Sequence, residues 1–211
     1  MPTPNEILSG LGDIANNWRG LAIFWHVYAV AVLALILTRC VSTRVIAVAL
    51  VTPLLSVSVL AGLTGNGFNS AIFAVLAGYL AIVALGSPPP ATQRMSVRKI
   101  VTAAALFVFG LIYPHFVQTP SFLTYIYEAP TGLIPCPTLS ILVALTIASG
   151  CVAWRAWAWG VGGIAGFYGI FGTIILGVRI DALLTAGAIL LLVIARKTHS
   201  FARNSKSLLQ L

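Results

Sequence analysis

Long apolar runs alternate with short polar segments along the whole chain. Most runs are about 15 to 20 residues long, close to the length of helix that crosses a hydrocarbon core about 30 Å thick. They do not alternate apolar and polar residues with the period of two that a half-buried strand shows. The pattern predicts seven helices, over residues 21–37, 45–63, 71–85, 100–113, 138–153, 159–176 and 182–195.

The composition places these helices in a lipid bilayer. Hydrophobic residues make up 59% of the chain and charged residues only 8%. A soluble domain of this size needs many more charges on its surface. An open sheet edge cannot satisfy its backbone groups in lipid, so strands are excluded as the spanning elements. We therefore predict an all-α integral membrane bundle of seven transmembrane helices, with the bilayer as its main partner.

The charges between the runs predict the orientation. With the N-terminus outside, the outer segments hold all four acids and two arginines, and the inner segments hold the other ten of the twelve basic residues. Lys and Arg in short loops stay on the cytoplasmic side, which predicts an outer N-terminus and a cytoplasmic C-terminus. The outer charges are Glu6, Asp13, Arg19, Glu128, Arg179 and Asp181. The net charge of +8 is thus explained by topology and lipid headgroups, and we expect no nucleic-acid partner.

Two segments complete the predicted organisation. Residues 1–195 form the transmembrane domain, and residues 196–211 form a basic cytoplasmic tail. Small residues recur along one face of the sixth run, where they allow close approach of a second helix. The glycines of this helix-packing face are Gly162, Gly166, Gly169 and Gly177.

The longest outer segment, residues 114–137, carries most of the candidate chemistry. The fourth and seventh runs are short, which draws polar groups near their outer ends toward the hydrocarbon, where ionisable groups need partners. Arg179 and Asp181 form either a structural ion pair or part of a binding site. The candidate outer-face polar site comprises Cys136, His115, Glu128, Arg179, Asp181, Tyr113 and His26.

Cys136 is the only cysteine on the outer side, so it has no partner for an intrachain disulfide. It lies between Pro135 and Pro137 at the start of a predicted helix, where the helix dipole favours a thiolate. It is either part of a rigid structural turn or a functional thiol. As a functional thiol it would bind a soft metal ion such as Cu(I), with His115 as second ligand.

Motifs of known enzymes are missing from the sequence. It has no HExxH, CxxC or GxSxG motif and no phosphate-binding loop, so we predict no enzyme activity and identify no cofactor. The seventh run contains no lysine that could bind retinal, which excludes a rhodopsin. Thiol chemistry at Cys136 is the remaining catalytic alternative.

The segment Ala129-Pro130-Thr131-Gly132-Leu133-Ile134-Pro135-Cys136-Pro137-Thr138 resembles the Pro-Thr-x-Gly-x-Pro-Cys-Pro-Thr signature of a bacterial family of multi-pass membrane proteins of unknown function. Tyr113-Pro114 and the segment from Leu176 to Asp181 agree with it. Thr131-Gly132-Leu133 departs from the family's usual Thr-Phe-Gly. The resemblance implies a multi-pass protein of the bacterial inner membrane with Cys136 as its focal point, and it implies no activity.

Two functions remain open at this point. The first is a permease for a small solute or a metal ion, with the outer polar site as its entrance. The second is an accessory subunit that packs its glycine faces against a larger membrane complex or against a second copy of itself. Few polar residues lie in the middle of the runs, whereas a permease usually has several there.

Overall fold

The computed structural model describes residues 3–88, 96–119 and 121–208, with side chains to residue 198. In these residues all the regular structure is helical, so the predicted all-α class is confirmed. The α-helices are α1 (Pro4–Asn17), α2 (Arg19–Thr38), α3 (Thr43–Leu63), α4 (Gly67–Gly86), α5 (Val97–Ile112), α6 (Tyr125–Glu128), α7 (Pro135–Ser149), α8 (Arg155–Ile174) and α9 (Ala182–Leu208). Short 3-10 helices are η1 (Phe122–Thr124), η2 (Cys151–Ala153) and η3 (Arg179–Asp181).

Each apolar run coincides with one long helix to within a few residues, except at the end of the last run, where α9 is longer. Three of these helices, α2, α3 and α4, are long and apolar enough to cross a membrane, and α7 is a shorter apolar helix. The chain is therefore a candidate membrane protein by the length and composition of its helices. Helix α9 continues past residue 195 to Leu208, so the predicted tail begins within a helix.

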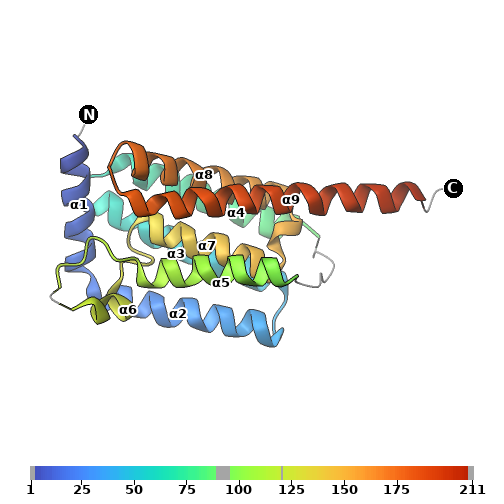
Figure 1. The fold of residues 1–211 in the computed structure, drawn as a ribbon, viewed down its shortest axis with the longest axis horizontal. Helices are drawn as coiled ribbons and strands as arrows, with labels where there is room; N and C mark the ends of the chain where they lie inside the picture. Colours follow the sequence, from blue (N-terminus) through green and yellow to red (C-terminus); the bar gives the residue numbers. More distant parts are fainter. Residues whose placement is uncertain (1–2, 89–95, 120, 209–211) are drawn as a thin grey trace.

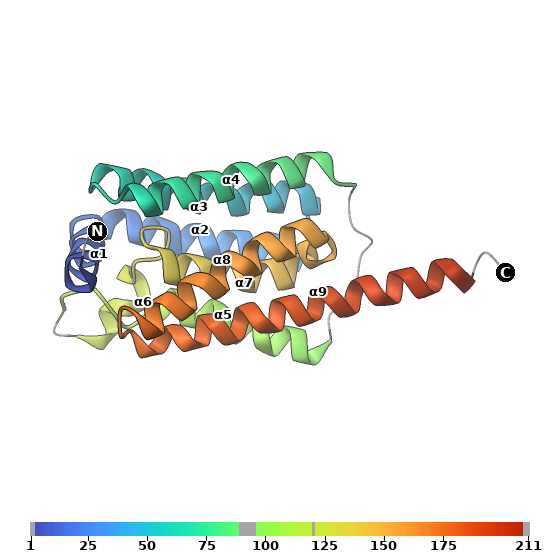
Figure 2. The same cartoon turned by 90° about the horizontal axis from the view of Figure 1, so that it is seen from above.

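The long helices run side by side, and α1 lies across one end of them (Figure 1). We call this end the α1 end; α6 and the loops that flank it also lie there, whereas the C-terminus lies at the opposite end (Figures 1 and 2). Helix α7 is the central element, because 13 of its 15 residues are buried. Its neighbours expose apolar side chains outward, as helices that face lipid do.

Helix α1 is held to the bundle by its apolar face. Leu11 and Ile14 are buried against Trp25 of α2 and against Leu133 and Ile134 of the loop before α7. Its N-terminus is closed by a capping box, in which Thr3 and Glu6 each accept a hydrogen bond from the other's backbone N–H. This amphipathic helix covers the α1 end of the bundle.

The glycine face of α8 is used inside the protein. A Cβ atom at Gly162 would lie 2.7 Å from Leu192, and one at Gly169 would lie 2.7 Å from the backbone nitrogen of Thr185, both in α9. Gly166 faces Ala188 of the same helix at an ordinary contact distance. Gly177 does not belong to this face: α8 ends at Ile174, and Gly177 lies in the following turn with φ +72° and nothing near its open side.

Candidate functional site

A buried carboxylate lies at the α1 end, where three elements meet. Asp181, the last residue before α9, is 1% exposed. One of its oxygens accepts a hydrogen bond from the hydroxyl of Tyr113 at 2.7 Å, and the other accepts one from the thiol of Cys136 at 3.2 Å. Tyr113 and Cys136 are also buried. We call these three residues the carboxylate cluster.

Prolines position two members of the cluster. Pro114 disfavours helical geometry at the residue before it, and α5 accordingly ends at Ile112, with Tyr113 at φ −23° and ψ 97°. Pro135 occupies the first turn of α7, where its missing N–H costs nothing, and it places Cys136 directly after it. The cluster therefore joins the end of α5 to the start of α7 and the turn before α9.

The loop that resembles a family signature shapes the start of α7. Gly132 has φ +73°, and a Cβ atom there would collide with the ring of Trp25. Its N–H donates to the hydroxyl of Thr138 at 2.8 Å, and that hydroxyl donates to the carbonyl of Ile134. The hydroxyl of Thr131 donates to the carbonyl of Gly110 in α5 at 2.8 Å. The threonines and the glycine of the motif thus hold the conformation of the loop before α7, and this loop positions Cys136 next to Asp181.

Helix α8 leaves room for the carboxylate at Gly172. A Cβ atom at this position would overlap the Oδ2 atom of Asp181.

A second buried polar pair lies between α4 and α8, where the hydroxyl of Tyr168 donates to the side-chain oxygen of Asn69 at 2.7 Å. Sequence reasoning missed Gly172, Asn69 and Tyr168. An asparagine at the start of an apolar run was the one signal that pointed to them.

No basic side chain pairs with Asp181 in the described part of the chain, where the single ion pair joins Arg19 to Glu128. The ion pair of Arg179 with Asp181, one of the two predicted alternatives, is therefore not formed: Arg179 is exposed and points to another side of the turn. Burial raises the pKa of the Asp181 carboxyl to about 6, against the opposing effect of its two hydrogen bonds.

The geometry makes Cys136 a thiol rather than the expected thiolate. Its sulfur donates a hydrogen bond to Asp181, and a thiolate next to a carboxylate would place two negative charges 3.2 Å apart. All three cysteines are free. Cys136 and Cys151 are buried, and Cys40 is exposed.

Of the other predicted site residues, His115 lies beside the cluster, with its ring centroid 6.5 Å from that of Tyr113, whereas His26 and Glu128 have partners of their own. His26 is buried in α2, with its ring nitrogens 2.8 Å from the carbonyl of Ala22 and 2.7 Å from that of Leu111, so it connects α2 to the end of α5. Glu128 faces Arg19. His115 lines an open bowl of about 310 Å³ between α1 and the segment after α5. Burial lowers the pKa of His115, so its imidazole is neutral at pH 7.

The predicted metal pair of Cys136 and His115 stays a prediction. Within the described residues, no three His, Cys, Asp or Glu side chains gather in a way that could hold a metal ion. The Cys136 thiol hydrogen points to Asp181, and no hydrogen bond joins Cys136 to His115. Of the seven predicted site residues, the structure brings three together, Tyr113, Cys136 and Asp181.

No protein-family model, curated protein or solved structure matches the chain. The resemblance to the bacterial family with the Pro-Cys-Pro-Thr signature therefore stays a prediction.

Proposed function

We propose that the protein is a seven-span protein of the bacterial inner membrane, with its N-terminus outside, and that it works as a proton-coupled permease for a small solute. Asp181 is the group that takes up and releases the proton. The observation that carries the proposal is a carboxylate buried at 1% exposure with two hydrogen-bond donors and no basic partner in the described chain.

The distribution of exposed charges supports the orientation. The described basic residues at the end opposite α1 are exposed or half-buried, whereas the acids lie at the α1 end. Short loops rich in Lys and Arg face the cytoplasm. The basic residues in question are Arg39, Arg44, Arg98, Lys99, Arg155, Arg196 and Lys197.

The cost of burying Asp181 supports a function in transport. An unpaired carboxylate in a low-dielectric environment is expensive, and such groups in membrane proteins mark proton and ion pathways. The raised pKa of Asp181, about 6, also lets the carboxyl change its protonation state close to neutral pH.

The glycine face of α8 does not support the alternative, an accessory subunit. It depended on a glycine face free to receive a partner, but Gly162, Gly166 and Gly169 all face α9 of the same chain. Helix α7 is enclosed, and its hydroxyl groups at Ser140 and Thr146 are already engaged in hydrogen bonds. We therefore take the described conformation as a closed state of the permease, which must rearrange to pass a solute.

The proposal is tested in proteoliposomes adsorbed to a solid-supported membrane. Amino acids, sugars, carboxylates and amines are applied one class at a time, with a pH gradient across the membrane. We expect a solute-induced current in the wild type, loss of the current in Asp181→Asn, and an unchanged current in Arg179→Gln, which alters an exposed charge two residues away. Absence of current with every class, together with migration in a large complex on native electrophoresis, would favour the accessory subunit.

A further inference from the structure

An aromatic pair separates the outer bowl from the carboxylate cluster. The bowl is lined by Asp13 and Gly12 of α1 and by His115 and Phe116. The ring of Phe116 is stacked on the ring of Tyr113, with the centroids 6.3 Å apart and the planes at 10°. The hydroxyl of Tyr113 in turn donates to Asp181. Phe116 therefore lies between the bowl and the buried carboxylate.

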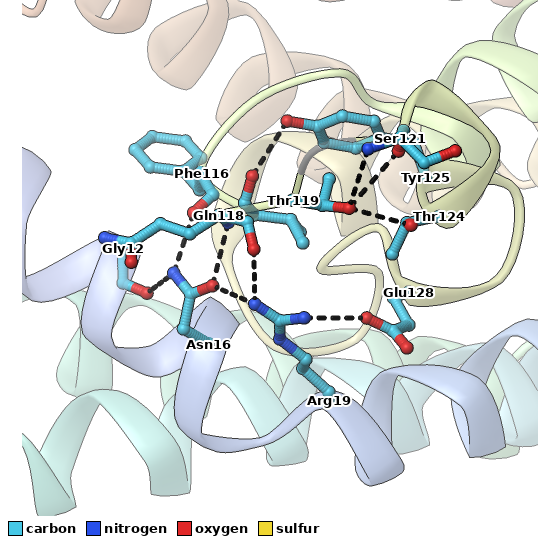
Figure 3. A network of polar contacts seen from close by, with 11 residues as sticks. Gly12, Asn16, Arg19, Phe116, Gln118, Thr119, Ser121, Thr124, Tyr125 and Glu128 are labelled. Atoms are coloured by element: carbon cyan, nitrogen blue, oxygen red, sulfur yellow. Dashed lines mark hydrogen bonds and ion pairs between the residues drawn. The ribbon is translucent and has the colours of Figure 1, made fainter.

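The backbone of Phe116 is in a conformation that it does not adopt by itself. Its φ is +73°, the left-handed region, which is costly for a bulky residue without surrounding structure to impose it. Such strain persists only where neighbouring contacts hold it. Residues 116–118 are held by apolar packing and by hydrogen bonds: Val117 is buried, Phe116 packs against the hydrophobic core, and the hydroxyl of Tyr125 donates to the carbonyl of Val117 at 2.9 Å. Further polar contacts come from Asn16 and Arg19 at the α1 end (Figure 3).

Asn16 and Arg19 hold this segment from the junction of α1 and α2. The amide nitrogen of Asn16 donates to the carbonyl of Phe116 at 2.9 Å, and its oxygen accepts from the N–H of Gln118 at 2.9 Å. Arg19 donates to the carbonyl of Gln118 at 2.7 Å and to the side-chain oxygen of Asn16 at 2.8 Å. Its other nitrogen pairs with Glu128 at 3.2 Å (Figure 3).

We propose that residues 116–118 form an outer gate over the carboxylate cluster, and that Asn16 and Arg19 are its latch. When the latch is released, the strained backbone relaxes, Phe116 leaves the ring of Tyr113, and Asp181 and Cys136 become accessible from the outer solution. The latch is made of half-exposed polar contacts, which water can replace. Opening also removes Phe116 and the buried Val117 from their apolar contacts, but it leaves the contacts between the long helices in place. This inference rests on the proposed function, for which it supplies the regulation of access to the site.

The experiment measures the accessibility of Cys136. The protein carries Cys40→Ser, which removes the one exposed thiol, and is placed in nanodiscs. A membrane-impermeant biotin-maleimide is added, and the labelling of Cys136 and Cys151 is followed by mass spectrometry. Cys151 is buried at the opposite end, beside the start of α8, so it reports unfolding of the bundle as a whole.

We expect slow labelling of Cys136 in the parent protein and labelling faster by about tenfold or more in Arg19→Gln and in Asn16→Ala, because the open fraction rises with the loss of latch contacts. Arg179→Gln makes the same chemical change on an exposed arginine at the same end and should leave the rate unchanged. Cys151 should stay protected in all variants. Glu128→Gln removes only the ion pair and is the second variant if Arg19→Gln does not fold.

Two outcomes overturn the gate. Equal Cys136 rates in the latch variants and in Arg179→Gln would mean that the segment does not control access. Parallel acceleration of Cys136 and Cys151 would mean that Arg19 and Asn16 stabilise the whole bundle only. The labelling assay does not require transport. Labelling that depends on the latch, without any solute current, would therefore contradict the proposed permease function and support the proposed gate.

Discussion

The carboxylate of Asp181 occupies the space that a side chain at Gly172 would fill. Asp181 belongs to the turn before α9, and Gly172 lies near the end of α8. Helix α8 approaches the cluster closely enough that only a hydrogen atom fits between its backbone and the acid. The buried site is therefore tied to helix packing at one residue, and this makes it open to a simple test.

Gly172→Ala should destabilise the protein, because the added methyl group must displace the carboxylate or move α8. Overpacking of this kind costs about 1–3 kcal/mol, more than the gain in helix propensity from Gly to Ala. Thermal unfolding in mild detergent measures the effect. Gly163→Ala is the matched control in the same helix, since no atom lies near a Cβ atom there. Equal melting temperatures for the two variants would show that the close approach is not maintained in the membrane protein.

The stability of the wild type should fall between about pH 4 and pH 6. Burial raises the pKa of Asp181 from 3.8 to about 6, so the folded state binds more protons than the unfolded state in this window. The protonated carboxyl of Asp181 contributes its full stabilisation below pH 4. This contribution, roughly 3 kcal/mol at most, is lost as the pH rises through 6. Asp181→Asn should remove this part of the pH dependence. Melting curves at pH 4, 5, 6 and 7 test it, and identical pH profiles would contradict an ionising Asp181.

Tyr113→Phe should weaken the cluster by leaving one oxygen of Asp181 without its 2.7 Å donor. A buried acceptor that loses its partner costs about 1–3 kcal/mol. The loss should be smaller in the Asp181→Asn background, because a neutral amide depends less on the phenol hydroxyl. A double-mutant cycle in detergent measures this coupling. Purely additive effects would mean that the hydrogen bond contributes nothing to stability.

Cys40 should react with an impermeant maleimide only from the cytoplasmic side. It is the exposed cysteine, and it follows α2 at the end opposite α1, close to Arg39 and Arg44. We expect labelling in inside-out membrane vesicles and protection in intact cells. Cys40→Ser supplies the background signal. Labelling of Cys40 in sealed cells would reverse the proposed orientation.

The amino-acid sequence by itself determined the all-α class and the approximate limits of the seven long helices, except the end of α9. It also indicated that the acids lie at one end of the bundle. These properties are local. The length of an apolar run and the sign of the charges beside it need no knowledge of the partner helices. Pro114 and Pro135 likewise indicated where α5 ends and α7 begins.

The tertiary structure alone decided which polar groups meet. Cys136 and Asp181 are 45 positions apart, and Arg19 and Glu128 are 109 apart. Their pairing depends on the rotation of each helix about its own axis. The sequence placed Glu128, Arg179 and Asp181 at one end of the bundle. It could not show that Arg19 forms the ion pair with Glu128, or that Asp181 accepts hydrogen bonds from a phenol and a thiol. Apolar faces surround α7 on all sides, so hydrophobicity does not select a rotation, and close contacts such as Gly172 against Asp181 do.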